Sequence, residues 1–224
     1  MMTGNQFDLI TFDCYGTLID WEGGITRAFQ EETARDKIQF NRDEIIASYM
    51  AEEPAVESER YRHYRDVLTE TAARVAARLG WNISKDRARF LPESLPRWEP
   101  FADTNAALER LARRYRLGIL SNTDDDLLAA TRRHFTVDFD LIVTAEQVKS
   151  YKPCHAHFKE AIRRAGGKRI LHAAQSYFHD IVPASELGLP VVWVNRKGEG
   201  ADADGRKPTH EVKGLAELVE LLGA

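Results

Sequence analysis

A mostly apolar segment that runs straight into a carboxylate constrains the fold of this chain more than any other feature. The segment Phe7–Phe12 is followed at once by Asp13, and Gly16 and Thr17 come just after it. Its length and composition predict a buried parallel strand, and in open α/β sheets ligands bind at the carboxyl ends of such strands. We therefore expect Asp13 to face a ligand site. Taken alone, the same pattern is equally typical of an aspartate that caps a helix.

Three later segments repeat the pattern of an apolar strand that ends in polar side chains. These predicted strands are Leu117–Leu120, Phe139–Val143 and Ile170–Ala174. The polar residues that follow them are Ser121 and Asn122 after the first, Lys152 after the second, and Ser176, Tyr177, His179 and Asp180 after the third. Each of the four strands therefore ends in side chains that can carry chemistry. Strands that alternate with helices in this way predict an α/β fold with a parallel sheet.

The segment between Trp21 and Pro100 has a different character, with helical patterns and few strand signals. The predicted helices are Gly24–Lys37, Arg42–Glu52, Glu57–Leu79 and Lys85–Leu95. From Tyr61 to Leu79, apolar residues recur every three to four positions, which indicates an amphipathic helix that packs in a bundle. A bundle inserted just after Asp13 is expected to cover the ligand crevice.

The four strand-end motifs, in this order and at roughly these spacings, resemble the signature of the haloacid dehalogenase superfamily, whose hydrolases use an aspartate nucleophile. The resemblance covers nearly the whole chain. It implies an α/β fold in which a Rossmann-like parallel sheet is flanked by helices and carries an inserted all-helical cap. Residues 1–20 and 101–224 would form the catalytic core, and residues 21–100 would form the cap.

Two positions distinguish the branches of this superfamily. Its magnesium phosphatases carry a second aspartate two residues after the nucleophile and another at the start of the last motif, where this chain has Tyr15 and Gln175. Magnesium requires hard oxygen ligands in near-octahedral geometry, so Asp13 and Asp180 alone would hold it poorly. The metal-free L-2-haloacid dehalogenase branch has tyrosine at the first of these positions. We therefore expect no metal and no cofactor.

The resemblance implies a covalent route. Asp13 would displace a leaving group from the carbon beside a substrate carboxylate, and water would then cleave the resulting ester at the Asp13 side chain. Lys152 would offset the negative charge gathered there, because two like charges ~4 Å apart repel by about 4 kcal/mol at an effective dielectric near ~20. Asp180 would position the hydrolytic water. The predicted catalytic residues are Asp13, Thr17, Lys152, Ser176 and Asp180.

The predicted substrate-binding residues surround this route. They are Cys14, Tyr15, Ser121, Asn122, Phe158, Tyr177 and His179. Ser121 would bind the substrate carboxylate, together with backbone N–H groups near Cys14 and Tyr15. Asn122 would hold the departing anion. His179, inside the last motif, is expected to line the site.

Several of these residues also have a purely structural interpretation. Lys152 is typical of a solvated lysine at a helix start, and Ser176 with Asp180 is typical of a turn that caps a helix. Cys14 is an alternative nucleophile, although a small residue at a buried strand end more often packs. The seven histidines give no persuasive set of metal ligands.

Other positions depart from the L-2-haloacid dehalogenase pattern and leave the leaving group open. That branch has an arginine early in the cap, where Ile46–Ala51 contains none. It has a tyrosine at the position of Phe158, and its last motif has serine and asparagine where this chain has Gln175 and Tyr177. In Phe158 and His179–Asp180 the chain is similar to a subgroup that includes an azetidine-2-carboxylate hydrolase. The candidate replacements for the missing arginine are Arg60, Arg62 and Arg65.

We therefore expect a hydrolase that converts a small 2-haloalkanoic acid to the 2-hydroxy acid. A ring-opening hydrolase of the azetidine-2-carboxylate type is one alternative, and a magnesium-dependent phosphatase of the same superfamily is another. A catalytically inactive relative that serves as a binding module is a third.

Composition limits the partners of the chain. Its 224 residues are 43% hydrophobic and 29% charged, which suits a soluble core domain with an insertion. A net charge of −4 argues against nucleic acid, and no apolar run reaches the length of a membrane span. Cys14 and Cys154 form no metal-type pair and favour a reducing cytoplasm. The expected partner is a small carboxylate-bearing substrate, and the sequence leaves a homodimer open.

Overall fold

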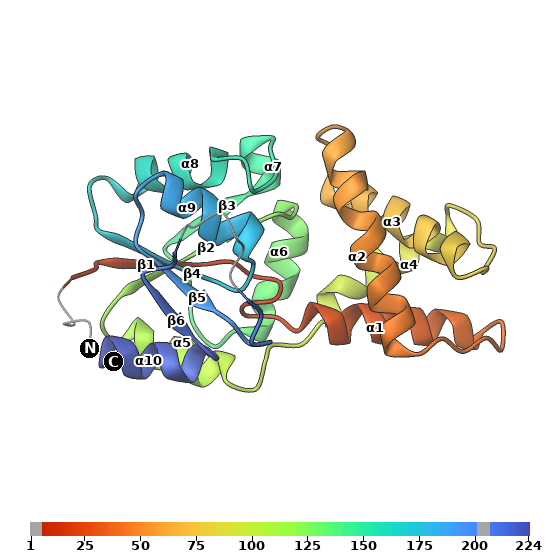
Figure 1. Ribbon diagram of the computed structural model, residues 1–224, viewed down its shortest axis with the longest axis horizontal. Coiled ribbons are helices and arrows are strands. Elements are labelled where there is room, and N and C mark those ends of the chain that lie inside the picture. Colours follow the sequence, from red (N-terminus) through yellow and green to blue (C-terminus); the bar gives the residue numbers. More distant parts are fainter. Residues whose placement is uncertain (1–5, 201–206) are drawn as a thin grey trace. The chain divides into compact units, whose positions relative to one another are not determined.

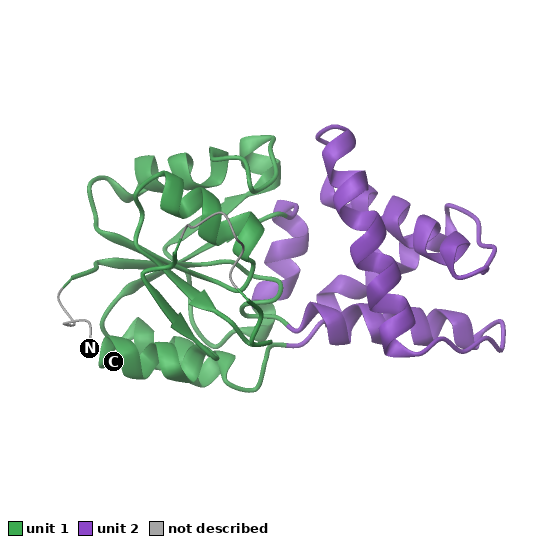
Figure 2. Cartoon of the chain, in the orientation of Figure 1, with its two compact units in different colours: residues 1–19, 100–122, 133–224 green, residues 20–99, 123–132 purple. Residues whose placement is uncertain are grey.

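The computed structural model describes residues 6–200 and 207–224. The chain divides into two compact units, shown in different colours in Figure 2. Unit 1 consists of residues 1–19, 100–122 and 133–224, and unit 2 of residues 20–99 and 123–132. Unit 2 thus contains the segment predicted to be inserted and, in addition, a short helical segment that follows the second strand.

Unit 1 is built on one six-stranded sheet in which every neighbouring pair is parallel. Its strands, in spatial order, are β3 (Leu141–Thr144), β2 (Arg116–Ser121), β1 (Leu9–Phe12), β4 (Ile170–Ala174), β5 (Val191–Val194) and β6 (His210–Val212). Strands β1, β4 and β5 are buried along their whole length, as expected for strands covered on both faces. The predicted α/β fold with a parallel sheet is confirmed.

Helices cover both faces of this sheet (Figure 1). One face carries α5 (Thr104–Ala112) and α10 (Leu215–Leu222), and the other carries α7 (Ala145–Val148), α8 (Ala156–Ala165) and α9 (Val182–Glu186). Between the sheet and the second group lies a hydrophobic core. Its buried members include Leu9, Leu120, Val143, Phe158, Ile181 and Trp193.

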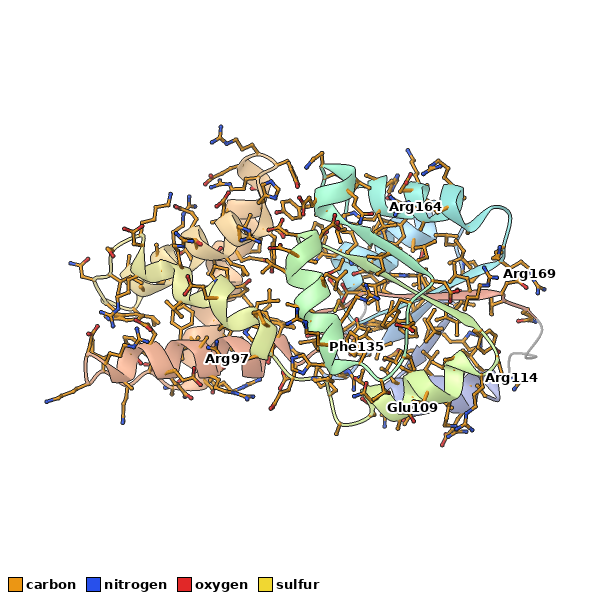
Figure 3. The ribbon with its side chains drawn as sticks, turned by 180° about the vertical axis from the view of Figure 1, so that it is seen from behind. Arg97, Glu109, Arg114, Phe135, Arg164 and Arg169 are labelled. Carbon is orange, nitrogen blue, oxygen red and sulfur yellow. The ribbon has the colours of Figure 1, made fainter. Side chains whose placement is uncertain are left out.

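An ion pair joins the amino ends of two adjacent strands. Arg169, labelled in Figure 3, precedes β4 and donates from Nε and Nη2 to the two oxygens of Asp8, each at 2.9 Å. This bidentate contact holds the pKa of the Asp8 carboxyl well below its usual value. Asp8 and Arg169 lie at the opposite end of the strands from the polar motifs, so the pair is part of the scaffold.

Unit 2 is helical. Its elements are α1 (Trp21–Ala34), α2 (Arg42–Glu59), α3 (Tyr64–Arg78), α4 (Phe90–Ser94) and α6 (Asp125–Thr131), with the 3₁₀ turns η1 (Arg87–Arg89) and η2 (Leu95–Arg97). Within residues 6–200 and 207–224, the structure contains no helix long and apolar enough to cross a lipid bilayer.

The second and third predicted helices of this unit had the wrong boundary. The sequence pattern placed a break between Glu52 and Glu57, whereas α2 continues through Pro54 and the break lies between α2 and α3. The third helix begins at Tyr64 because the buried carboxylate of Asp124 accepts the N–H groups of Tyr64 and Arg65 at 2.8 and 3.0 Å. Asp124 therefore caps α3 from a distant part of the chain, and local sequence carries no information about where this helix begins.

A close approach within unit 2 depends on one glycine. A Cβ atom placed on Gly24 in α1 would lie 2.3 Å from Cγ of the Trp98 indole. Trp98 is itself buried and donates from Nε1 to Ser94 Oγ at 2.9 Å, so its ring has little freedom to move. The contact requires the absence of a side chain at Gly24.

We expect Gly24→Ala to lower the free energy of unfolding by about 1–3 kcal/mol, the usual cost of forcing extra volume into a packed core. Urea unfolding followed by circular dichroism would measure it. Gly200→Ala is the matched control, since a Cβ there meets nothing within 4 Å, and it should stay within about 0.5 kcal/mol of wild type. Equal stability of the two variants would contradict the packing argument.

Candidate active site

Asp13 lies just beyond β1 at the carboxyl edge of the sheet, and the residues after it form a tight turn. Gly16 has a φ of 105°, a backbone conformation that favours glycine, and its N–H donates to the Ile19 carbonyl at 2.8 Å. The turn brings Thr17 back to the carboxylate, where Thr17 Oγ1 donates to Asp13 Oδ2 at 2.9 Å.

Lys152 places its ammonium group between two buried carboxylates. Nζ lies 2.9 Å from Asp13 Oδ1 and 2.7 Å from Asp180 Oδ1, and it donates to the Leu120 carbonyl at 3.0 Å. Three acceptors use all three of its N–H bonds. The Lys152 side chain is 1% exposed, so the interpretation of Lys152 as a solvated lysine is wrong.

The two carboxylates that share this cation have pKa values shifted in opposite directions. Burial raises the pKa of Asp13 above its usual value, and Lys152 only partly offsets this effect. Burial also opposes ionisation of Asp180, but Lys152 and a hydrogen bond from His172 outweigh it and lower its pKa to about 2. The pKa of Lys152 is raised because both carboxylates together overcome its own burial. Asp180 is therefore the more firmly ionised of the two acids.

The backbone of Lys152 is held by Asn122. The Lys152 N–H donates to Asn122 Oδ1 at 2.7 Å, and Asn122 Nδ2 donates to the Lys152 carbonyl at 3.1 Å. This two-way pair joins the loop after β2 to the segment that carries Lys152. The contacts make Asn122 a positioning residue, and its predicted role in holding a leaving anion stays a prediction.

The first and last motifs are joined through Thr17. Its hydroxyl accepts the N–H of Gln175 at 2.9 Å while it donates to Asp13, and the Gln175 carbonyl accepts from Trp193 Nε1 at 2.8 Å. Gln175 takes part in these bonds through its main chain. The Gln175 side chain takes part in neither bond, and it offers no carboxylate where the phosphatases have an aspartate.

The last motif forms a π-helical turn, η4 (Tyr177–Ile181), that carries Asp180. Ser176 is its N-cap, since Ser176 Oγ accepts the N–H of His179 at 3.2 Å and lies 3.0 Å from His179 Nδ1. Ser176 and His179 therefore shape the turn that presents Asp180. Direct roles for them in catalysis or substrate binding stay predictions.

Among the described residues, the buried polar atoms without a hydrogen-bond partner include Ser121 Oγ and Asp180 Oδ2, which belong to motif residues at this edge. An unsatisfied buried polar group costs about 1–3 kcal/mol. Such atoms are the ones that a bound substrate or water would satisfy.

Several of the other predicted binding residues are buried by the protein itself. Cys14 is fully buried, and burial and the nearby Asp13 charge raise the pKa of its thiol far above the usual value, which argues against a cysteine nucleophile. Phe158 and Tyr177 lie in the hydrophobic core, where Tyr177 packs edge-on against Trp193. Tyr15 forms a bridge with Ile19 through the backbone. Substrate contacts by Phe158, Tyr177 and Tyr15 stay predictions.

The geometry of the residues around Asp13 agrees with the protein family that the sequence matches. The profile described as haloacid dehalogenase-like hydrolase covers residues 7–178. The chain belongs to this family. The resemblance inferred from the four motifs is thereby confirmed.

The similar proteins include several dehalogenases. An (S)-2-haloacid dehalogenase of Pseudomonas putida is 28% identical over 215 residues, which is 93% of each chain. The L-2-haloacid dehalogenase of Xanthobacter autotrophicus, solved with chloropropionic acid covalently bound, has a TM-score of 0.84 at 18% identity, covering 97% of this chain and 99% of that one. A magnesium-bound hydrolase of the same superfamily from Bacillus subtilis also has a TM-score of 0.84, at 17% identity, covering 98% and 100%. The fold alone therefore does not decide whether this haloacid dehalogenase-like hydrolase uses a metal.

The residues around Asp13 do not fit a magnesium site. Asp13 Oδ1 and Asp180 Oδ1 both accept from the Lys152 ammonium, and Asp13 Oδ2 accepts from Thr17. The two positions that supply further carboxylates in the phosphatases are Tyr15 and Gln175. Too few oxygen ligands are left for a hard divalent cation.

Two arginines proposed as replacements for the missing cap arginine are already paired inside unit 2. Arg62 forms an ion pair with Glu59, and Arg65 forms ion pairs with Asp124 and Asp126. Arg60 is exposed. Binding of a leaving anion by any of these arginines stays a prediction.

Sequence reasoning missed three residues near the carboxylates of this haloacid dehalogenase-like hydrolase. His172 Nε2 lies 3.0 Å from Asp180 Oδ1, and Thr11 Oγ1 lies 2.9 Å from His172 Nδ1. His157 Nε2 lies 3.2 Å from the Ser121 carbonyl, and its burial and the Lys152 charge lower its pKa to about 3, so it is neutral. The available signal was a histidine within an otherwise apolar strand.

The charge compensation by Lys152 can be tested through stability. We expect Lys152→Met to lower the free energy of unfolding at pH 7 by about 3–5 kcal/mol, the usual cost of leaving buried charges without their partner. Without the cation, burial raises both carboxyl pKa values above those of the unfolded chain. The folded variant then binds protons that the unfolded chain does not, so its deficit narrows as the pH falls from about 7 toward about 4.

Urea unfolding at a series of pH values measures this deficit. Lys159→Met, at an exposed position of α8, is the matched control and should stay within about 0.5 kcal/mol of wild type throughout. A deficit for Lys152→Met that does not change with pH would show that Lys152 does not compensate these carboxylates.

Proposed function

We propose that this chain hydrolyses small (S)-2-haloalkanoic acids to 2-hydroxy acids through a covalent ester on Asp13. The observation that carries the proposal is the buried ammonium of Lys152 between Asp13 and Asp180. The two positions at which the magnesium phosphatases have further aspartates are Tyr15 and Gln175 in this chain. Membership of the hydrolase family and similarity to (S)-2-haloacid dehalogenases over most of the chain support it.

In the first step, an oxygen of the Asp13 carboxylate attacks the carbon that bears the halogen. A carbon–oxygen bond forms, the carbon–halogen bond breaks, and the halide leaves with the bonding electron pair, so no proton moves. Attack opposite the leaving group inverts the configuration at that carbon. Thr17 and Lys152, which donate to the two Asp13 oxygens at 2.9 Å each, hold the carboxylate in place.

In the second step, water attacks the side-chain carbon of the Asp13 ester. The bond from this carbon to the substrate oxygen breaks, and the Asp13 carboxylate is restored with one oxygen taken from water. We assign the positioning of this water to Asp180, whose Oδ2 is buried without a hydrogen-bond partner in the described part of the chain.

Charge selects the substrate class. Asp13 and Asp180 carry two negative charges against one on Lys152, so a substrate carboxylate must be held by neutral donors. Ser121 Oγ is the candidate, since it is buried and makes no hydrogen bond within residues 6–200 and 207–224. This arrangement favours a small substrate with one carboxylate over a doubly charged phosphate ester.

The remaining assignments rest on composition. Cys14 and Cys154 are both free, which is consistent with a reducing cytoplasm. The net charge of −4 supports a small-molecule substrate and not a nucleic acid as the partner.

We expect Asp13→Asn to abolish turnover of (S)-2-chloropropionate, because an amide is a far weaker nucleophile than a carboxylate. A single turnover of the wild type in oxygen-18 water should label Asp13, as read by peptide mass spectrometry. Asp138→Asn, at an exposed position, is the matched control. Label that enters the product directly on the first turnover would contradict the ester.

Activity should be unchanged by EDTA and unaffected by added magnesium. Three of the four carboxylate oxygens of Asp13 and Asp180 already accept from Lys152 or Thr17, and Tyr15 and Gln175 supply no further carboxylate. The measurement is halide release from both enantiomers of 2-chloropropionate, with azetidine-2-carboxylate and a phosphate ester tested alongside. Turnover that is lost with chelator and restored by magnesium would favour the phosphatase alternative.

A further inference from the structure

A buried histidine that the proposed route does not yet use touches Asp180. His172 lies in the middle of β4 and is fully buried. Its Nε2 lies 3.0 Å from Asp180 Oδ1, and its Nδ1 lies 2.9 Å from Thr11 Oγ1. An ionised carboxylate can only accept, so the hydrogen in the first contact belongs to His172 Nε2.

The strand pairing explains this chain of contacts. Thr11 in β1 and His172 in β4 are register partners in adjacent parallel strands, so their side chains point to the same face of the sheet. Phe158 packs edge-on against the imidazole, with ring centroids 5.2 Å apart and an interplanar angle of 88°. The ring is therefore held at Nδ1 by a hydroxyl and on one face by an aromatic side chain.

The result is an uneven distribution of donors on Asp180. Its Oδ1 accepts from both Lys152 Nζ, at 2.7 Å, and His172 Nε2, at 3.0 Å. Its Oδ2 is buried and accepts from no group that the structure describes. Two donors that converge on one oxygen fix the rotation of the carboxylate and leave the other oxygen available.

We propose that His172 is a positioning residue for the hydrolysis of the ester, which rests on the ester route proposed above. By binding Oδ1 together with Lys152, it holds Asp180 with Oδ2 turned toward the water that attacks the Asp13 ester. Thr11 acts through His172, because its hydroxyl sets the orientation of the imidazole.

The proton balance confines this role to the second step. Formation of the ester moves no proton, since the halide leaves as an anion. In ester hydrolysis, the water oxygen bonds to the Asp13 side-chain carbon and a water proton passes to Asp180 Oδ2. The bond to the substrate oxygen then breaks, and the proton on Asp180 passes to that oxygen to give the hydroxy acid. The second water proton leaves the Asp13 carboxyl for the solvent, so that the carboxylate is restored. Loss of the orientation of Asp180 should therefore slow hydrolysis and spare ester formation.

The test is rapid-quench kinetics of His172→Phe and His172→Gln with (S)-2-chloropropionate, with halide release reporting the first step and intact mass reporting the ester. His172→Phe removes the donor and keeps a planar ring, so hydrolysis should slow by about tenfold or more while the first step stays within about threefold. The ester should then accumulate on Asp13. His172→Gln places an amide N–H near the position of Nε2 and should restore hydrolysis to within about threefold.

A second pair keeps the proposal testable if His172→Phe does not fold. Thr11→Val removes the hydroxyl at nearly constant volume and should slow hydrolysis selectively, whereas Thr11→Ser should not. Equal slowing of both steps, or unchanged hydrolysis in His172→Phe and Thr11→Val, would overturn the role of His172. Absence of any ester in the wild type would instead overturn the proposed function.

Discussion

A single ammonium group shared by two buried carboxylates organises the catalytic edge of this protein. Lys152 uses its three N–H bonds on Asp13, on Asp180 and on the carbonyl at the end of β2, so its position is set by three separate parts of unit 1. Burial of charges is expensive, at several kcal/mol per ion, and a buried ion pair is weak support for stability. Stability of the fold therefore gives little reason for this ion pair, whereas the proposed chemistry of Asp13 gives one.

The same cation leaves the two acids in different states because the other donors around them differ. Asp180 also receives the hydrogen bond from His172, and its pKa falls, whereas Asp13 has burial as its dominant influence and its pKa rises. Pairs of carboxyl groups whose environments separate their pKa values commonly divide the work of a reaction. The proposed division is nucleophile for Asp13 and orientation of water for Asp180.

Much of this arrangement could be predicted from local sequence. The strands that precede Asp13 and Ser121 are recognisable as apolar runs, and polar residues at their ends point to a common edge of the sheet. Lys152 and Asp180 follow from the order of the four motifs. The break between α2 and α3 could not be predicted, because Asp124, sixty positions from Tyr64 in the chain, supplies the capping oxygen.

Local sequence was enough to predict the α/β class, the family and the motif residues Thr17, Lys152 and Asp180 around Asp13, because periodicity and strand-end motifs are properties of neighbouring residues. Which residues interact at this site depends on the folded chain. The tertiary structure paired Asn122 with the backbone of Lys152, and it placed His172 beside Thr11 because β1 and β4 are adjacent strands. Strand order and hydrogen-bond partners depend on contacts between distant segments, and no local pattern specifies them.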